Sequence, residues 1–472
     1  MIFNSLLYIL FLPVVYIVFY ITKDQHRWLV LLLFSYGFYA SLNAPHLLLV
    51  LILITIISFY CGSVLGRTTD ETKRKWVFLA GVTGCILILV IFKYLHIIMP
   101  SSFANIYSSL LVSIGISYFI FQSVSYIVDV YMEIHPPEQH FGHYSLYMAF
   151  FPKLLQGPIE RAGDLLPQLK KPYVFNYDTM RSGMHLFAWG LFKKAIVADR
   201  LSLYVNPVYG DVHTYVGLPF ILATYAYAMQ IFFDFSGYTD MARGTARLFG
   251  LSLTENFNSP YLAPSIADFW RRWHISFSRW ILDYIFKPLQ MSWRNLGQHG
   301  SALALLITFF ISGIWHGATW GFVLWGVLHG VYLAASTYYR PYQKKLHKWF
   351  KLDKSKVLRA WQVLVTFNLV SFSWIFFRMG SVADAWYAII HMFSGIGNVR
   401  AWFFVEGNLE LVRTALALFV IVISVIIKHY TRIPQTFYSQ PLLARWTCYC
   451  VICFLMLCLY VRADSQFIYF KF

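Results

Sequence analysis

The stretch that decides the fold is residues 301–330, SALALLITFFISGIWHGATWGFVLWGVLHG. Residues 301–315 carry no charge, and after His316-Gly317 a second apolar run, residues 318–328, follows. Runs of this kind suit a helix that crosses a hydrocarbon core about 30 Å thick. An ionisable side chain at membrane depth is costly and points to function, and histidine exchanges a proton near neutral pH. The stretch therefore predicts a membrane protein with a proton-transfer group, His316, inside the bilayer.

The composition supports a membrane protein along the whole chain. The 472 residues are 58% hydrophobic and 12% charged, with a mean hydropathy of +0.57, whereas a soluble domain carries about a quarter charged residues. Because a backbone in lipid must satisfy its own hydrogen bonds, the spans are expected to be helices. We predict an all-α polytopic protein with about ten or eleven transmembrane helices. The apolar runs are 2–21, 28–42, 47–65, 77–98, 110–130, 216–233, 301–315 with its continuation, 363–377, 411–427 and 446–461.

Loop charges predict the orientation of the chain. The first apolar run has no basic leader and no cleavage site, so we expect it to be a span and not a removable signal. Basic residues follow the first and third spans, at 23–27 and 67–75, whereas the alternate loops, 43–46 and 99–109, have no lysine or arginine. The positive-inside rule then places the N-terminus outside the cytoplasm. The side of the C-terminus stays open.

The simplest domain organisation is one membrane domain, 1–472. It would contain N-terminal spans in 1–131, a core in 139–340 and C-terminal spans in 357–472. Two regions within the core, 139–203 and 238–300, break the pattern of spans and are dense in aromatic residues. Re-entrant or amphipathic interfacial helices are the expected structures there.

The charge balance does not indicate nucleic-acid binding. The net charge is +17, but the basic residues lie in loops between spans, where cytoplasmic bias and anionic lipid headgroups explain them. A patch for anionic coenzyme A or an acidic polysaccharide cannot be separated from this explanation by sequence. The six cysteines form no metal-binding or disulfide pattern and predict small apolar packing. We expect no metal and no permanently bound cofactor.

Residues 269–280, FWRRWHISFSRW, predict one strongly amphipathic helix. At 100° per residue its bulky aromatic rings fall on one side and its basic residues on the other. His274 lies on the seam between the two faces, beside Arg271 and Ser278. Arg271 and Arg272 are candidates to bind the substrate or the acyl donor. A surface-lying helix with His274 as a polar-rim residue is the alternative to a functional histidine.

The helix expected around His316 carries one polar stripe. Thr308, Ser312, His316 and Trp320 are spaced by four residues, and a second face is formed by glycines at 313 and 317, which would allow close helix approach in a membrane. A histidine that bonds across helices for structure alone remains the alternative to catalysis or transport.

Further polar residues are candidates for supporting roles. Asp234, at the end of the 216–233 run, is predicted to orient a histidine or to pair with an arginine. Gln156 lies in the QGPIER stretch, residues 156–161, which is compatible with a simple turn. His329 points to a different side of a continuous helix from His316, which favours a structural role. No phosphate-binding loop, nucleophile elbow or zinc motif is present.

Several blocks of the sequence carry a family resemblance. In chain order they are 114–118 through 125–131, 157–161, 233–241, 255–261, 270–278, 313–317, 325–326 and 329–330. Together they resemble the membrane-bound O-acyltransferases, and specifically the bacterial branch that acetylates alginate.

The resemblance implies a fold and an activity. The fold is a ring of tilted helices around a thin centre where tunnels from both membrane faces meet. The family's two histidines correspond to His274 and His316. Acetyl from cytosolic acetyl-CoA would pass to an extracytoplasmic acceptor, with a partner of the SGNH-hydrolase type placing it on an exopolysaccharide. The location would be the bacterial inner membrane.

The resemblance and the chemistry of acyl transfer together suggest roles for the candidate residues. Acyl transfer to a hydroxyl needs a base and donors for the developing oxyanion. His316 is the predicted base, and His274, Arg271 or a backbone N–H would hold the carbonyl oxygen or the coenzyme A phosphates. Trp315 and Ser312 are expected to support the site beside His316.

One departure leaves the acceptor open. Where alginate-branch members have Gly-Gly after the histidine helix, this chain reads DYIFKPLQMSWRN, residues 283–295. Cellulose, peptidoglycan or another exopolysaccharide is therefore as reasonable as alginate. The chain is also compatible with D-alanyl transfer to teichoic acid, with lipid acylation, with a transporter that lacks acyl-transfer chemistry, and with a non-catalytic scaffold for polysaccharide export.

Overall fold

The part of the chain that the structure describes is mostly helical, and no strand occurs in it. The computed structural model describes residues 3–42, 45–98, 115–350, 355–394, 439–460 and 467–468. The prediction of an all-α protein is confirmed. The expected span at 411–427 lies outside the described residues.

The described residues contain part of the ten or eleven transmembrane helices that are predicted for the whole chain. Six are found in the described residues: Leu47–Arg67, Glu71–Leu95, Leu218–Leu248, Arg294–His316, Lys356–Arg378 and Leu442–Leu459. Leu6–Ile21 is a shorter apolar helix. The run 301–328 forms two separate helices, and the helix in 110–130 is described only from Ile116. These six helices make the protein multi-pass.

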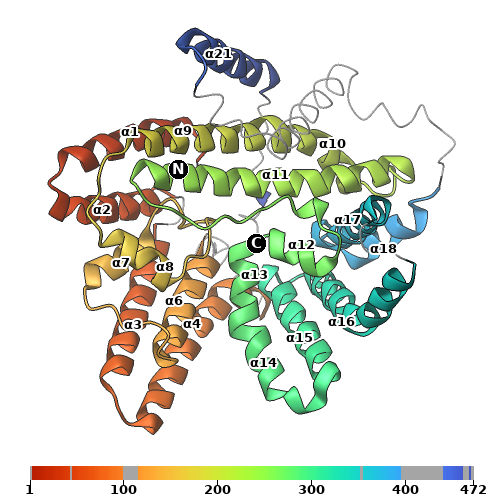
Figure 1. The fold of residues 1–472 in the computed structure, drawn as a ribbon, viewed down its shortest axis with the longest axis horizontal. Coiled ribbons are helices and arrows are strands. Elements are labelled where there is room, and N and C mark those ends of the chain that lie inside the picture. The colour runs from red at the N-terminus through yellow and green to blue at the C-terminus, as the bar shows by residue number, and fades with distance from the viewer. Residues whose placement is uncertain are drawn as a thin grey trace. The chain divides into compact units, whose positions relative to one another are not determined.

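The described helices, which are labelled in Figure 1, belong to two compact units. The first unit comprises Met1–Phe187 and Tyr238–Ser373, and the second comprises Ala188–Gly237 and Trp374–Lys471. The unit boundaries fall inside α9 (Tyr177–Phe192), α11 (Leu218–Leu248) and α17 (Lys356–Arg378). The helices wholly within the first unit are α1 (Leu6–Ile21), α2 (Arg27–Ala40), α3 (Leu47–Arg67), α4 (Glu71–Ile98), α6 (Ile116–Tyr131), α7 (Phe141–Ala149), α8 (Ala162–Leu169), α12 (Ile266–Arg272), α13 (Ile275–Ile281), α14 (Lys287–Ser292), α15 (Gly297–His316) and α16 (Trp320–Trp349).

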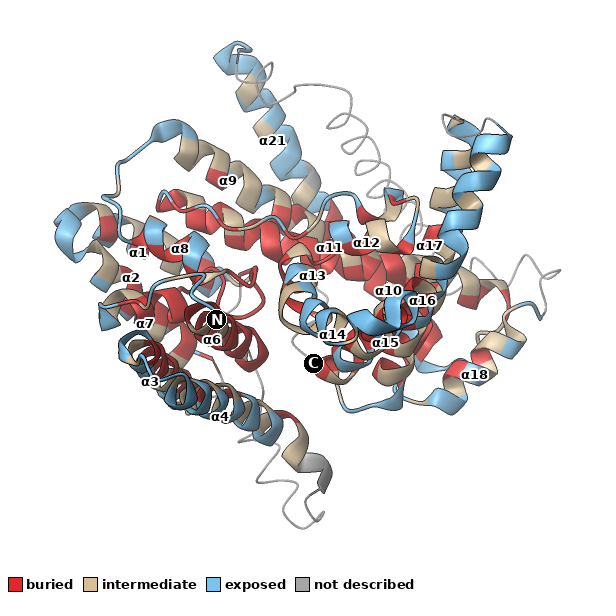
Figure 2. Ribbon diagram, turned by 60° about the horizontal axis from the view of Figure 1, so that its bottom comes forward, coloured by how far each residue is buried: buried red, intermediate tan, exposed pale blue. Residues whose placement is uncertain are grey.

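In the first unit, α6 packs against α3 and α4 and is the buried member of the three (Figure 2). Nearly every α6 residue from Ile116 to Val130 is buried, whereas α3 and α4 expose apolar residues on their outer faces. Small residues allow the close packing, because a Cβ on Gly62 would lie 2.6 Å from the ring of Tyr126. An outward apolar face is what lipid contact requires.

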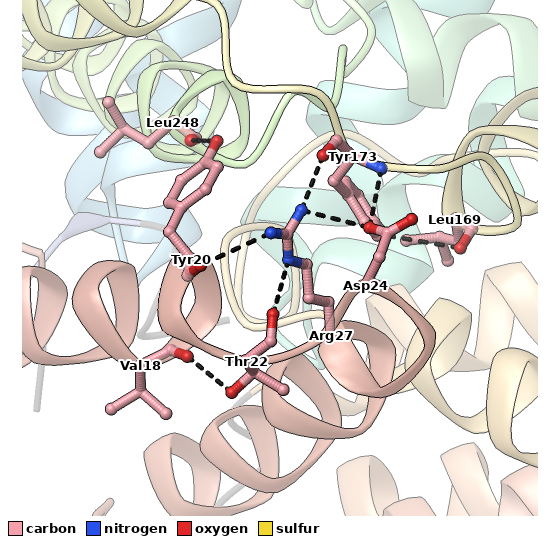
Figure 3. Close-up of polar contacts among 8 residues, drawn as sticks. All are labelled: Val18, Tyr20, Thr22, Asp24, Arg27, Leu169, Tyr173 and Leu248. Atoms are coloured by element: carbon pink, nitrogen blue, oxygen red, sulfur yellow. Dashed lines mark hydrogen bonds and ion pairs between the residues drawn. The ribbon is translucent and has the colours of Figure 1, made fainter.

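The corner between α1 and α2 is held by Arg27 (Figure 3). Its guanidinium donates to the carbonyl oxygen of Tyr173 at 2.7 Å and to Asp24 at 3.1 Å, while its Nε donates to the carbonyl oxygen of Thr22. The hydroxyl of Tyr20 donates to the carbonyl oxygen of Leu248 at 2.9 Å. These contacts join the first two helices to Tyr173 and to the end of α11. Arg27 therefore has a structural role in addition to its expected effect on the orientation of the chain in the membrane.

The first irregular region, 139–203, contains a buried connection between α7 and α8. Residues 150–160 form turns without a regular helix, and all of them are buried. A Cβ on Gly115, which has a φ of 77°, would meet the backbone of Leu154 and Leu155. This segment is buried in protein, but it has no regular helix, so the expected re-entrant or interfacial helix is not found at residues 150–160.

The second irregular region begins later than predicted. The 216–233 run predicts a helix end near Asp234, but α11 continues without a break to Leu248. The polar residues of this extension have partners inside the protein: Arg243 lies 3.4 Å from Asp240 and 3.5 Å from Glu255. A helix can therefore continue past the apolar run because tertiary contacts satisfy its polar side chains.

The second unit contains a buried lysine, Lys194. Its other elements are the π-helical turn η3 (Lys193–Ala198), α10 (Asp199–Gly210), α18 (Val382–His391) and α21 (Leu442–Leu459). Lys194 lies 2.6 Å from Asp234 and 2.9 Å from Asp199, and Asp234 also accepts from the backbone N–H of Ile468. The buried ammonium is thus paired, as burial requires.

Candidate functional site

His316 lies at the last position of α15. Gly317 is extended, with a φ of 173°, and the next helix, α16, begins at Trp320. The His316 side chain is buried, and its ring lies 4.6 Å from the ring of Trp315 and 4.9 Å from that of Trp325, between centroids. The predicted polar stripe is therefore correct only as far as His316, because the chain turns at Gly317 and Trp320 is exposed.

The glycines beside His316 bring α15 and α16 into close contact. A Cβ on Gly313 would lie 2.5 Å from the carbonyl oxygen of Phe322, and one on Gly326 would lie 2.3 Å from that of Phe309. The close helix approach predicted from the small residues is confirmed. It fixes the end of α15 against the start of α16, and with it the position of His316.

His274 is not on a helix face, which corrects the prediction of one helix over 269–280. The segment forms two short helices, α12 and α13, and His274 is the residue before α13, with a left-handed φ of 42°. Asn256 holds the break: its carbonyl oxygen accepts from the N–H of Ile275, and its side chain accepts from the N–H of Ser276. A periodic pattern cannot reveal a break whose hydrogen-bond partner lies elsewhere in the chain.

The aromatic stripe of this segment faces protein and not a membrane interface. Trp270, Trp273, Phe277 and Trp280 are all buried, and His274 is only 1% exposed. The alternative of His274 as a polar-rim residue on a surface helix is therefore wrong. Arg271 is exposed, and Arg272 forms a 2.8 Å ion pair with Asp268.

Phe277 brings the two histidines into one cluster. Its ring centroid lies 5.1 Å from that of His274 and 6.0 Å from that of His316, and it stacks on Trp315 at 4.5 Å. Tyr118, from the buried helix α6, lies 6.3 Å from both His274 and Trp315. Separate elements of the chain thus converge on the pair of histidines, which residue spacing alone could not show.

Several polar atoms around this cluster have no hydrogen-bond partner in the described part of the chain. These buried atoms are Tyr118 Oη, Ser312 Oγ and Trp315 Nε1. Buried polar groups in proteins are almost always satisfied, so each exception needs an explanation. Polar groups of this kind beside two histidines are suited to binding an oxygen-rich substrate.

The remaining predicted site residues lie in defined places. Gln156 belongs to the buried 150–160 connection, whose Ile159 N–H donates to Ser276, two residues after His274. Asp234 belongs to the second unit, where its partners are Lys194 and the N–H of Ile468; in the described chain no arginine or histidine pairs with it. The assignment of these residues to the site stays a prediction.

Lys93, a buried cation beside His316, is absent from the residues predicted from the sequence. Its ammonium donates to the carbonyl oxygen of Trp315, and the hydroxyl of the next residue, Tyr94, donates to that of Ile314. The sequence does contain the signal, because Lys93 lies within the apolar run 77–98 and a charge there indicates function by the rule applied to His316.

A second buried lysine lies in the 150–160 connection. The ammonium of Lys153 has no hydrogen-bond partner among the described residues and lies 5.0 Å from the ring centroid of Tyr147. Glu160, also buried, accepts from the backbone N–H of Thr254 at 2.6 Å. Burial lowers the pKa of Lys153 to about 7 and raises the pKa of Glu160 to about 7.

In the part of the chain that the structure describes, no group of three or more histidine, cysteine, aspartate or glutamate residues is arranged to hold a metal ion.

Comparison with known proteins gives one consistent result. The family model for the membrane-bound O-acyltransferases matches residues 20–382. The chain is 32% identical over 433 residues to a peptidoglycan O-acetyltransferase of Helicobacter pylori, covering 82% of this chain and 78% of that one. It is 32% identical over 466 residues to a "Probable alginate O-acetylase AlgI" of Pseudomonas aeruginosa, covering 94% and 83%. It is also 27% identical over 316 residues to a teichoic acid D-alanyltransferase of Bacillus subtilis, covering 65% and 79%.

Proposed function

Because the chain belongs to the membrane-bound O-acyltransferase family, we propose that it transfers acetyl from cytosolic acetyl-CoA towards the hydroxyl groups of an exported polysaccharide. The enzyme class, a membrane O-acyltransferase, follows from the family and the named relatives. The relatives named for acetyl transfer are 32% identical to this chain, and the D-alanyl transferase is 27% identical, which favours acetyl as the group.

The observation that carries the proposal is the shared aromatic cluster of His274 and His316. Both imidazoles are buried, and both lie within about 6 Å of the ring of Phe277. A buried imidazole near polar groups without protein partners suits general-base chemistry on a hydroxyl substrate.

In the proposed reaction, His316 takes the proton of the acceptor hydroxyl while its oxygen attacks the thioester carbonyl carbon. His274 orients the acyl group or donates to its carbonyl oxygen. The exposed Arg271 suits a different task, contact with the coenzyme A phosphates, because surface guanidinium groups bind phosphate well. Trp315, Ser312 and Gln156 shape the pocket around the acyl group.

The acceptor is proposed as a class, not as one polymer. The two relatives named for acetyl transfer carry the names of different acceptors, peptidoglycan and alginate, and residues 283–295 depart from the alginate-branch pattern. We propose an exported polysaccharide reached with the help of an extracytoplasmic partner of the SGNH-hydrolase type.

The proposed location is the bacterial inner membrane with the N-terminus outside the cytoplasm. The basic segments 23–27 and 67–75 support this orientation through the positive-inside rule. Single cysteines placed at residue 45 and at residue 69 of a cysteine-free variant would test it. A membrane-impermeant thiol reagent on intact spheroplasts should label only residue 45, and the reverse pattern would contradict the orientation.

The experiment that tests the function uses the purified full chain in lipid nanodiscs with acetyl-CoA labelled in the acetyl group. We expect release of the coenzyme A thiol and transfer of label to polysaccharide fragments, and loss of O-acetyl from the cell's exported polysaccharide when the gene is deleted. D-alanyl carried by a carrier protein is the second donor to test, because the teichoic acid D-alanyltransferase is also similar. Transfer of D-alanyl without acetyl would overturn the assignment of acetyl, and transfer of neither would overturn the proposed function.

A further inference from the structure

Lys93 is a charged residue buried in a helix that is otherwise apolar around it. It lies in α4, where residues 76–92 contain no charge, and its side chain is 7% exposed. A charge at such a position is retained at a cost in free energy, so it indicates a function or a specific partner.

The contacts of Lys93 are with neutral groups. Its ammonium donates to the carbonyl oxygen of Trp315 and lies 5.4 Å from the ring centroid of the same residue. In the described part of the chain no carboxylate forms an ion pair with it. A lysine ammonium has three N–H donors, so this arrangement leaves donors available to a ligand.

Lys93 and Tyr94 both bond to the end of the helix that carries His316. Their acceptors, the carbonyl oxygens of Trp315 and Ile314, belong to the last turn of α15, where helix carbonyls have no partner within the helix. The negative end of the helix dipole also favours a cation there. A structural role as a helix cap is therefore the simpler explanation that a test must separate from a catalytic one.

The position of Lys93 is nevertheless suited to more than capping. Its ammonium bonds to the carbonyl oxygen of Trp315, the residue directly before His316. The arginines predicted from the sequence are less suited, because Arg271 is exposed and Arg272 is paired with Asp268. Among these three basic residues, Lys93 is the one that is both buried and adjacent to His316.

We infer that Lys93 is a further catalytic residue, whose ammonium donates to the acyl carbonyl oxygen as negative charge develops on it. The inference rests on the proposed function. The acceptor oxygen bonds to the carbonyl carbon, the C=O π electrons move to the oxygen that Lys93 holds, and His316 takes the hydroxyl proton. When the C=O bond re-forms, the C–S bond breaks, and the thiolate leaves with that electron pair and takes the proton from His316. The products are the O-acyl ester and the coenzyme A thiol.

The test compares variants that separate charge from capping. Lys93→Met removes both the charge and the donor, Lys93→Gln keeps a donor for the Trp315 carbonyl without the charge, and Lys93→Arg keeps the charge. Tyr94→Phe is the matched control, because it removes the neighbouring cap on Ile314 and no charge. For each, kcat and KM for acetyl-CoA are measured with the thermal unfolding temperature in nanodiscs.

Loss of an oxyanion donor costs about 10²- to 10³-fold in kcat. We expect this loss for Lys93→Met and Lys93→Gln, with KM changed by less than about 3-fold because the interaction forms in the transition state. Lys93→Arg should recover part of the rate, and Tyr94→Phe should lose less than about 10-fold. If Lys93→Met does not fold, the comparison of Lys93→Gln with Tyr94→Phe still separates a catalytic role of Lys93 from helix capping.

Two results would overturn the inference while leaving the proposed function intact. One is equal losses in Tyr94→Phe and the Lys93 variants, which would show a capping role alone. The other is normal kcat in Lys93→Gln. An unmodified protein that transfers no acyl group from any donor would contradict both the inference and the proposed function.

Discussion

Trp270 donates its indole N–H to Nδ1 of His329 at 3.2 Å. The other ring nitrogen, Nε2, lies 2.9 Å from the hydroxyl of Ser373, and the ring is fully buried. Both nitrogens are thus occupied by protein groups, which supports the structural role predicted for His329 and separates it from His316.

His329→Ala should therefore lower stability more than catalysis. The variant leaves the buried N–H of Trp270 without its acceptor, which costs about 1–3 kcal/mol, whereas the hydroxyl of Ser373 keeps its bond to the carbonyl oxygen of Val370. Thermal unfolding in nanodiscs should show a lower midpoint, while kcat per folded molecule stays within about 10-fold of the unmodified protein. A large loss of kcat at unchanged stability would assign His329 to the reaction instead.

His316→Ala should show the opposite behaviour. Removing a positioned general base commonly costs about 10²- to 10⁴-fold in rate, and His316 lies at the end of α15, where the helix does not depend on its side chain. We expect loss of acetyl transfer with nearly unchanged expression and unfolding temperature. His299→Ala, at an exposed histidine that bonds to the hydroxyl of Tyr338, is the matched control and should remain active. Normal acetylation by a well-folded His316→Ala protein would refute the assignment of His316 as the general base.

At His274 the backbone and the side chain make separable contributions. A left-handed φ costs a residue with a Cβ about 1–2 kcal/mol, and glycine avoids this cost. His274→Gly should therefore be more stable than His274→Ala by about 1 kcal/mol. Both variants should lose activity to the same extent if the imidazole is what matters. Recovery of activity in His274→Gly relative to His274→Ala would show instead that the turn, not the ring, is required.

Glu138 is expected to stabilise the folded protein at neutral pH and to lose this contribution at acidic pH. Burial raises the pKa of this carboxyl, but Lys170 at 2.6 Å and the backbone N–H groups of Gln139 and His140 outweigh burial, so the pKa is lowered overall. A lowered folded-state pKa adds stability above the ordinary glutamate value of 4.5, and that stability is lost as pH falls through the folded-state pKa.

The unfolding temperature of Glu138→Gln should therefore fall less between pH 6 and pH 3 than that of the unmodified protein. Asp178→Asn is the control, because Asp178 is exposed and forms an ion pair with Arg181. Exposed ion pairs contribute little to the free energy of unfolding. Identical pH profiles for Glu138→Gln and the unmodified protein would rule out this contribution.

The features that depend on local pattern are the ones that the sequence predicts well. Apolar runs locate most helices, and the spacing of Gly313 and Gly317 indicates a tightly packed helix around His316. The rule on buried charge that selects His316 applies equally to Lys93, because both lie within apolar runs of membrane-spanning length. Lys93 was therefore predictable from the sequence.

The remaining features depend on tertiary contacts that no local pattern contains. The break at His274 needs Asn256, and the extension of α11 past Asp234 needs partners for its polar residues. The convergence of Tyr118 and Phe277 on the histidines likewise joins elements far apart in the chain. Periodicity predicts a face of a helix, but it cannot predict which remote residue that face meets.

Gly313 sets how closely α15 approaches α16. A Cβ on Gly313 would lie 2.5 Å from the carbonyl oxygen of Phe322, a backbone atom that a side-chain rotation cannot move away. Gly313→Ala must therefore push the two helices apart, and overpacking of this kind costs about 1–3 kcal/mol. Because His316 is three residues further along α15, the displacement should also lower kcat.

Gly84→Ala is the control for Gly313→Ala, since a Cβ at Gly84 in α4 would meet nothing within 4 Å. Alanine has the higher helix propensity, so Gly84→Ala should be neutral or slightly stabilising and fully active. Thermal unfolding and acetyl transfer, measured side by side, check both effects. Equal stability and activity in the two variants would mean that the helices do not pack as closely as the structure shows, and the position of His316 would then need another explanation.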